Sequence, residues 1–187
     1  SRADLSGADI NKANLTGATL TGANLLGADL AETILSQAMM SGVNLNRSDL
    51  SNVDLSECNL SQASLIGVEM SRADLTAANL SDANLKRAEL QRTKLVKADL
   101  SGANLADARL LNADLSEAQL QETNMKGARL NRANLTKANF HAANLADANL
   151  LGANLTAATL TAANLLNVNL SGADLTLATL QNADLEG

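Results

Sequence analysis

The chain has 187 residues, with 20 acidic and 14 basic side chains, a formal net charge of −6, no Pro, Trp or Tyr, and single Phe, Cys and His residues. One cysteine excludes an intrachain disulfide framework and a cysteine-based zinc site, and no apolar run approaches the ~18 residues of a membrane span. The negative charge argues against nucleic acid as a partner. With 46% hydrophobic residues, the chain is too apolar for the disordered class, so we expect a folded domain.

A repeat of five residues runs through the whole chain. Every residue whose number is a multiple of five, from Leu5 to Leu185, is large and apolar, and 32 of these 37 positions hold Leu. The residue two places earlier is small, and it is Ala in 28 cases. The residue between the two is Asn or Asp in 25 cases. All eleven glycines lie two residues after a large position, and no insertion or deletion breaks the phase.

A chain that turns once per repeat accounts for this pattern. On an α-helix, a step of five residues rotates by ~500°, so the leucines would leave no apolar stripe. On a straight strand, five is odd, so the next Leu would point to the opposite face. The other two slots are rich in Ser, Thr, Asn, Asp and Gly, and Gly supplies the positive φ of a type II turn. The pattern therefore predicts a β-solenoid with an interior of Leu and Ala.

The five-residue units also carry a family resemblance. The units ADLSG (Ala3 to Gly7) and ANLTG (Ala13 to Gly17) resemble the A-[DN]-L-x-x unit of the pentapeptide repeat family, and the match extends from Ala3 to Gly187. The resemblance implies an all-β fold, a right-handed quadrilateral parallel β-helix with four repeats per coil. The 37 repeats would then form about nine coils, with ~4.8 Å between stacked strands. We expect a single domain over residues 1–187, and the phase also allows two shorter solenoids joined end to end.

If one coil takes twenty residues, side chains twenty apart should stack. Opposite charges then meet at Asp74–Lys94–Asp114, Arg87–Asp107, Glu89–Arg109 and Lys97–Glu117–Lys137. Like charges meet at Asp9–Asp29–Asp49, Glu69–Glu89, Arg72–Arg92 and Arg109–Arg129. Opposite-charge and like-charge pairs are about equally frequent at this spacing, so the charges do not decide the length of the coil. Stacked amides are expected to hydrogen-bond from coil to coil along Asn84, Asn104, Asn124, Asn144 and Asn164.

Charge varies along the chain. Residues 1–85 carry a net charge of −6, residues 86–137 carry +4, and residues 138–187 hold four acidic groups and no basic one. One hypothesis is a functional basic collar formed by Lys86, Arg87, Arg92, Lys94 and Lys97. We favour the alternative that the charge drifts along solvated faces.

The residue types that carry chemistry are isolated in this sequence. His141 has no acidic residue nearer than Asp147 and no second His beside it, so we expect an exposed side chain without a catalytic role. Cys58 replaces Ala in the small inward slot, so we expect a core residue. A rod without loop insertions offers no concave pocket. The sequence therefore predicts no catalytic, cofactor-binding or metal site, and a protein that is not an enzyme.

Outward apolar residues are the candidates for a partner surface. Ile34 and Met39 take the usual Asn/Asp slot in consecutive repeats, and Leu26 and Ile66 share another outward column. Because a contiguous exposed apolar patch marks a partner surface, these four residues form the candidate patch. The terminal repeats carry no charged or helical cap, so either caps were removed or another chain covers the ends. On the second alternative we expect a homo-oligomer that forms end to end through the terminal coils.

The main functional hypothesis is a non-catalytic structural or protein-interaction module, a rigid rod whose faces or ends bind an unidentified protein. The resemblance supplies an alternative, because some members of the family mimic B-DNA, bind DNA gyrase and confer quinolone resistance. The acidic segments fit that alternative, whereas the +4 middle and the lack of loops depart from it. A Thr- and Ser-rich column from Thr16 to Thr176 raises a third reading, an ice- or surface-binding rod. A chain with one cysteine and no leader is expected in the cytoplasm.

Overall fold

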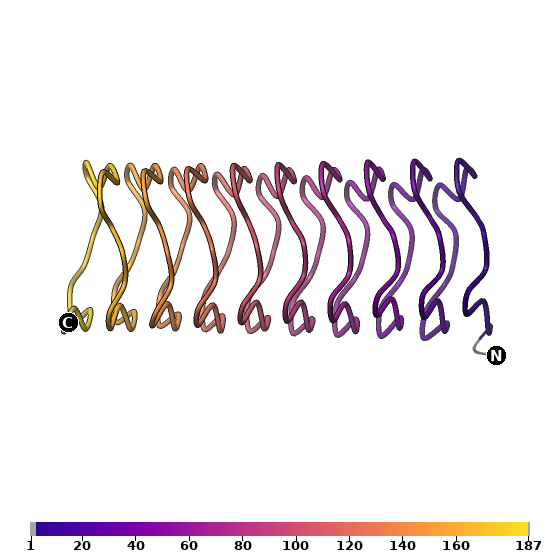
Figure 1. The fold of residues 1–187 in the computed structure, drawn as a ribbon, viewed down its shortest axis with the longest axis horizontal. Coiled ribbons are helices and arrows are strands. Elements are labelled where there is room, and N and C mark those ends of the chain that lie inside the picture. The colour runs from indigo at the N-terminus through magenta and orange to yellow at the C-terminus, as the bar shows by residue number, and fades with distance from the viewer. Residues whose placement is uncertain (1–2, 187) are drawn as a thin grey trace.

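The computed structural model describes residues 3–186 as a rod of stacked coils, with the two chain ends at opposite ends of the rod (Figure 1). Within these residues there is no helix, and each five-residue unit contributes one isolated bridge residue in place of a longer strand. Parallel bridges run without a break from Asp4↔Asn24 to Asn164↔Asp184, and each joins residues twenty apart. One coil therefore takes twenty residues and has four sides, with one column of bridge residues along each side.

The two inward slots of each repeat build a single core along the axis. From Leu25 to Leu160 the large inward residues are at most 1% exposed. Burial of each such side chain contributes roughly 1.5–3 kcal/mol, and this gain offsets the entropy lost when the chain is ordered. In the two terminal coils the same slots are half-buried, for example at Leu5 and Leu175, because a neighbouring coil covers them on one side only.

Four polar residues occupy the small inward slot, and their hydroxyls are all satisfied. Thr33, Ser48, Thr93 and Thr123 are fully buried. Each hydroxyl donates to a backbone carbonyl of a large inward residue, at distances from 2.6 to 3.0 Å. Buried polar groups cost little when they are bonded in this way, so the core accepts these departures from Ala.

In residues 79–83 every backbone amide finds an acceptor. The amides of Asn79, Leu80 and Asp82 donate to carbonyls of the adjacent coils at 2.6–3.0 Å. The Ala83 amide donates to the Leu80 carbonyl at 3.0 Å and closes the turn. The remaining amide, of Ser81, donates to the side-chain oxygen of Asn79 at 2.9 Å. The fifth bond depends on a side chain and therefore on the sequence.

This side-chain bond explains why the bridge slot holds Asn or Asp. All 25 Asn and Asp residues in that slot accept a hydrogen bond from the amide two residues later. Asn and Asp are the residues whose short side chains form such Asx turns. At Asp174, hydrogen bonds from the Thr176 hydroxyl and then from the Thr176 amide lower the pKa of the carboxyl group.

Replacement of one capping side chain should therefore weaken the rod locally. We expect Asn104→Ala to lower the free energy of unfolding by about 0.5–1.5 kcal/mol, because the amide of Ala106 loses its acceptor. Thr159→Ala is the matched control, since Thr159 lies in the same slot and its side chain caps no amide. Urea denaturation of both variants measures the difference. Equal losses in the two variants would contradict the assigned role of the Asx turn.

The third residue of each turn has a positive φ, and glycine supplies only part of this requirement. From Gly7 to Asn182 all these residues have φ between 54° and 67°, and 26 of them are not glycine. The left-handed conformation disfavours a residue with a Cβ by roughly 1–2 kcal/mol. The buried leucines beside each turn hold the chain in this conformation, so the glycines mark the turn slot without being necessary at every turn.

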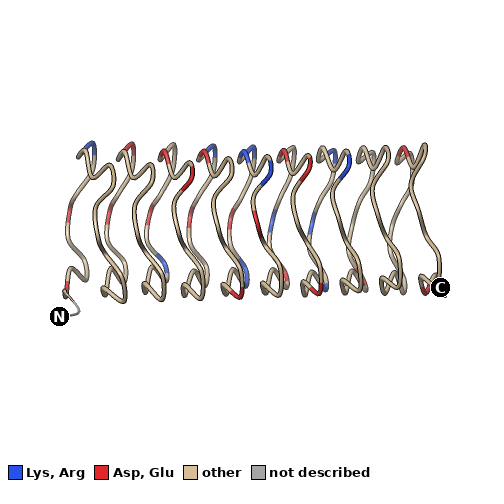
Figure 2. Ribbon diagram, turned by 180° about the vertical axis from the view of Figure 1, so that it is seen from behind, with Lys and Arg blue, Asp and Glu red and all other residues tan. Residues whose placement is uncertain are grey.

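Charged side chains pair between coils as the twenty-residue spacing predicted. Four of the six predicted ion pairs form: Arg87–Asp107 (4.0 Å), Lys94–Asp74 (3.0 Å), Lys97–Glu117 (3.8 Å) and Arg109–Glu89 (3.3 Å). Within residues 3–186, Lys94–Asp114 and Glu117–Lys137 do not pair. The sequence did not indicate the pair Lys126–Asp147 (3.6 Å), because these residues are not twenty apart. Figure 2 shows that the basic residues concentrate in the middle coils.

The predicted ladder of asparagine amides is largely replaced by the turn bonds. Within the predicted column, one amide bond joins adjacent coils, from Asn124 Nδ2 to Asn104 Oδ1 at 3.3 Å. All five asparagines instead use their oxygens to accept the amide two residues later. The expectation of a continuous ladder was wrong: the bond that all five side chains share is the one to the turn of their own coil, and among these five described residues a bond to the adjacent coil forms only between Asn124 and Asn104. Along residues 3–186 there is also no helix long and apolar enough to cross a membrane.

Candidate interaction surfaces

The predicted apolar patch divides between two edges of the rod. Successive bridge residues of one coil lie on its four sides in turn, so Ile34 and Met39 lie on neighbouring sides. They flank the turn at Ser36 and Gln37, and they are 41% and 53% exposed. Leu26 lies in the turn two corners away, diagonally across the coil. The structure thus brings Ile34 and Met39 to one edge and places Leu26 at the opposite edge.

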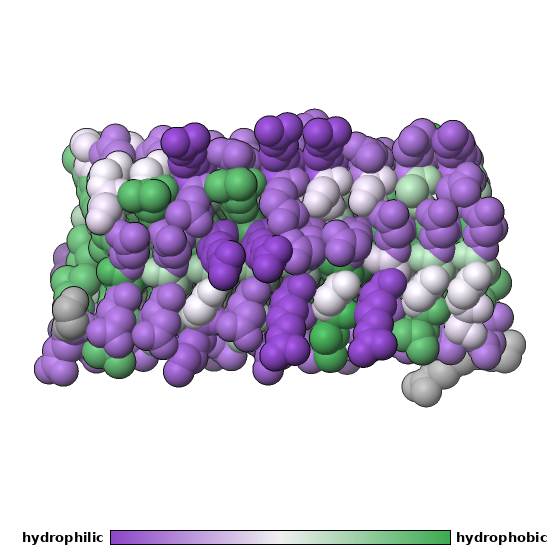
Figure 3. Space-filling model, viewed as in Figure 1, coloured by the Kyte–Doolittle hydropathy of each residue, from purple (hydrophilic) through white to green (hydrophobic). Residues whose placement is uncertain are grey.

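Ile66 lies on the same edge as Leu26, two coils further along, and the two side chains do not form a continuous apolar surface. Asn46 occupies the intervening position of the column. Its side-chain oxygen accepts the amide of Ile66 at 2.7 Å and the hydroxyl of Ser64 at 2.9 Å. Figure 3 shows one side of the rod, on which hydrophilic residues form rows along the axis with separate hydrophobic residues among them.

His141 has the surroundings of an ordinary surface residue. Its ring nitrogen Nδ1 lies 2.9 Å from the hydroxyl of Thr161 in the next coil. Its backbone amide donates to the side-chain oxygen of Asn139. Thr161 is the hydrogen-bonding partner of the ring, and the contact holds the imidazole against the rod. Among residues 3–186 no acidic side chain forms an ion pair with it.

Cys58 is 1% exposed in the core, and burial raises the pKa of its thiol to about 12. The thiolate is the reactive form of cysteine, so the folded protein should resist alkylation at this site. We expect a thiol reagent at pH 8 to label the native chain at least tenfold more slowly than the chain in denaturant. Comparable rates in the two states would show that the coil around Cys58 opens readily.

One side of the rod collects charge in a single column, which we name the charged side. Its bridge residues, in chain order, are Asp9, Asp29, Asp49, Glu69, Glu89, Arg109, Arg129, Asn149 and Asn169. Five acidic residues are therefore stacked ~4.8 Å apart, followed by two arginines. Sequence reasoning noted the separate like-charge steps but did not join them into one column. Reading every twentieth residue from Asp9 would have found it.

The electrostatics of the charged side are unbalanced around Glu69. Partial burial raises the pKa of the Glu69 carboxyl, Glu89 and Asp49 raise it further, and Arg109 opposes them. Arg109 lies 3.3 Å from Glu89. Within residues 3–186, neither Glu69 nor Arg129 takes part in an ion pair. Both side chains are exposed, and both are free to meet a partner.

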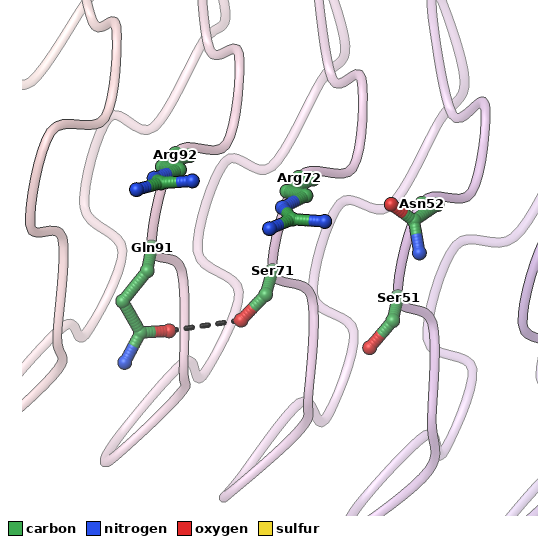
Figure 4. A pocket seen from close by; sticks show the side chains of 6 residues that line it. All are labelled: Ser51, Asn52, Ser71, Arg72, Gln91 and Arg92. Atoms are coloured by element: carbon green, nitrogen blue, oxygen red, sulfur yellow. Dashed lines mark hydrogen bonds between the residues drawn. The ribbon is translucent and has the colours of Figure 1, made fainter.

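A shallow groove lies along the edge next to the charged side. It encloses about 470 Å³ and is lined by Ser51, Asn52, Ser71, Arg72, Gln91 and Arg92 (Figure 4). The Ser71 hydroxyl donates to the side-chain oxygen of Gln91 at 2.9 Å. The guanidinium groups of Arg72 and Arg92 lie above it on adjacent coils. The lining is polar and cationic, and it contains no group placed to act as a general base.

Comparisons with known proteins agree with this architecture. The sequence matches the family described as pentapeptide repeats, in eight copies, over residues 1–37, 43–82, 54–92, 83–118, 113–152 and 153–187. The chain is similar to HetL, a pentapeptide repeat protein involved in the regulation of heterocyst differentiation in the cyanobacterium Nostoc sp., with 36% identity and a TM-score of 0.80. That match covers 98% of this chain and 87% of HetL. No curated protein sequence matches the chain.

A second similar structure shows the fold alone. Full-length QnrB1, a plasmid-mediated fluoroquinolone resistance protein, is 19% identical, with a TM-score of 0.62 over 97% of this chain and 91% of QnrB1. The pentapeptide repeat structures imply a right-handed β-helix for this chain, as the resemblance in the sequence predicted.

Proposed function

The chain belongs to the pentapeptide repeat family, and we propose that it is a non-catalytic protein-interaction module, a rigid rod whose exposed rows bind another protein. The observation that carries the proposal is the unbroken ladder of bridges from Asp4 to Asp184, which sets exposed side chains in straight rows along four sides. Rows on a rigid support are pre-organised for binding, because little conformational entropy remains to be lost. The similarity to HetL, a protein involved in regulation, also supports the proposal.

The proposed rod is a single quadrilateral domain over residues 1–187, with 37 repeats in about nine coils. The constant phase of the repeat and the twenty-residue bridges support this count. A cytoplasmic location is part of the proposal and rests on the single, buried cysteine.

The edge that carries Ile34 and Met39 is the proposed contact with the partner protein. Both residues replace an Asx cap with an exposed apolar side chain, so selection for the turn does not explain them. We expect Ile34→Ser combined with Met39→Ser to reduce at least tenfold the amount of a specific protein that co-purifies with the chain from its source organism.

The matched control for this experiment is Leu111→Ser combined with Leu151→Ser. These two leucines are 43% and 45% exposed, and they lie on a different edge. The control variant should retain the partner at the level of the original chain. Equal retention of the partner by both variants would contradict the assignment of the Ile34 and Met39 edge as the contact surface. The proposed function itself fails if no protein is retained specifically by the original chain.

DNA mimicry directed at DNA gyrase is the second candidate function. The observation that favours it is the acidic half of the charged side, where five carboxylates stack at a regular spacing from Asp9 to Glu89. A supercoiling titration with DNA gyrase, with and without a quinolone, tests it. Inhibition or drug protection at low micromolar protein would support mimicry. No effect at a hundredfold higher concentration would exclude it.

End-to-end association of the 187-residue chain is a further part of the proposal. The half-buried inward residues of the terminal coils support it, and Leu185 is 55% exposed. Such an association would bury apolar surface, so high salt should not weaken it. Light scattering should detect growth with protein concentration, and a strict monomer at high concentration would count against this mode.

A further inference from the structure

We propose that the charged side binds the charged side of a second copy of this chain, with the two rods antiparallel. This inference goes beyond the proposed function, because it needs no other protein. It rests on the order of charges in one column: five acidic residues up to Glu89, then Arg109 and Arg129, then two asparagines. When a second copy of this column runs in the opposite direction, its two arginines lie opposite the last two acidic residues of the first copy.

Symmetry decides between the two ways of placing two such sides face to face. A two-fold axis along the rods would set every bridge residue opposite its own copy, so that five carboxylates would face five carboxylates. A two-fold axis across the rods, passing between Glu89 and Arg109, reverses the column instead. Glu89 then faces Arg109 of the second copy, and Glu69 faces Arg129 of the second copy, each twice by symmetry. Complementary charge therefore selects the antiparallel arrangement.

Glu69 and Arg129 contribute most to this argument. Both are exposed, and within the described part of the chain neither has an ion-pair partner. In a single rod, Glu69 lies between Glu89 and Asp49, and partial burial together with these two carboxylates raises the pKa of its carboxyl group. An arginine of the second copy would neutralise that excess charge. The Glu69 carboxylate and the Arg129 guanidinium of the second copy thus each provide the opposite charge that the other lacks in a single rod.

The edge that comes just before the charged side in each coil, formed by turn residues such as Arg87 and Asp107, gives independent support. A two-fold axis across the rods keeps this edge opposite the same edge of the second copy. Residues there face each other as Arg87 with Asp107, Arg47 with Asp147, and Leu26 with Leu166. The two leucines are 43% and 36% exposed in the single rod. Two further opposite-charge pairs and one apolar contact therefore arise from residues outside the charged column.

The edge that comes just after the charged side in each coil, which carries Arg72 and Arg92, contains one unfavourable contact. There Arg72 lies opposite Arg132 of the second copy, while Arg92 lies opposite Asn112. Both arginines lie at the rim, where solvent screens the repulsion between them. This contact reduces the affinity, but it does not reverse the preference set by the charged column and the opposite edge.

The size of the surface predicts a weak dimer. Eight bridge positions of each rod overlap, from residue 29 to residue 169, which corresponds to roughly 38 Å of rod at ~4.8 Å per coil. One side is roughly 16 Å wide, so each copy buries roughly 600 Å², at the lower limit of specific interfaces. We expect a dissociation constant in the micromolar range that rises with salt.

Charge reversal with a compensating swap tests the proposal. Sedimentation equilibrium of the purified chain should show a dimer at about 50 mM salt that weakens at about 500 mM. Glu69→Arg alone and Arg129→Glu alone should each weaken the dimer at least tenfold. The double variant carrying both substitutions should restore it, because each reversed group again faces its opposite. Neither residue caps a turn amide, so both single variants should fold, as circular dichroism will check.

Gln119→Arg on the opposite side of the rod is the control and should leave the dimer unchanged. A monomer at every concentration would overturn the proposal, and so would a dimer that Glu69→Arg does not weaken. A salt-resistant dimer that survives both single reversals would assign the association to the terminal coils. A strict monomer would also count against end-to-end association, but none of these outcomes affects the proposed binding of another protein, because the experiment contains no other protein.

Discussion

Leu100→Ala should lower the free energy of unfolding by roughly 2–5 kcal/mol, the largest effect that we expect from a single substitution. Leu100 is fully buried in the middle of the rod, and inward residues of the coils on both sides pack around it. The variant loses the apolar burial of the removed carbons and leaves a cavity that the stiff coils cannot close. Urea denaturation followed by circular dichroism measures the change.

Leu177→Ala is the control for this effect, because Leu177 is 79% exposed and lies in a turn. Its stability should stay within about 0.5 kcal/mol of the original chain. Leu175→Ala should fall between the two, since Leu175 is only half-buried in the terminal coil. Similar losses at Leu100 and Leu177 would contradict a core made of the positions that are multiples of five.

Ala103→Leu should destabilise the chain by roughly 1–3 kcal/mol, the second large effect. Ala103 is fully buried in the small inward slot, where the coil leaves no room for a second large side chain. The added carbons would press the facing sides apart and strain the backbone bonds to both neighbouring coils. Thermal or urea unfolding measures the loss of stability.

Ala106→Leu is the matched control, because Ala106 lies in an outward turn slot of the same repeat unit and is partly exposed. Its extra side chain extends into solvent, so the stability should change by less than about 0.5 kcal/mol. If Ala103→Leu were tolerated as well as Ala106→Leu, the two slots would not differ in the way that the fold requires.

The sequence predicted the direction of each side chain better than the bonds that hold the coils together. Five-residue periodicity reports which slots face inward, so the leucine and alanine core followed from it directly. The hydrogen bond from Ser81 to Asn79 did not, because periodicity reveals a preferred residue type without its partner. Positive φ at residues such as Arg92 was also hidden, since the sequence marks this slot only where it holds glycine.

The candidate surfaces were harder to predict because they depend on which residues share a side. The patch predicted from Leu26, Ile34, Met39 and Ile66 grouped outward apolar residues without settling which of them share an edge of the rod. In a coil with four sides, a step of five residues moves the chain to the next side, so the patch divides between opposite edges. The charged side becomes visible only when residues twenty apart are read together. Surface ion pairs of ~0–1 kcal/mol are too weak to impose that spacing on the sequence.

Deletion of one complete coil tests the central claim most directly. The claim is that twenty residues form the structural unit and that side chains twenty apart share a row. A chain that lacks residues 101–120 should keep its circular dichroism and unfold in one cooperative transition, because the phase and all four columns rejoin. A chain that lacks residues 101–118 should lose that transition, since the inward and outward slots fall out of phase. Loss of folding in the first variant, or equal behaviour of the two, would contradict the account.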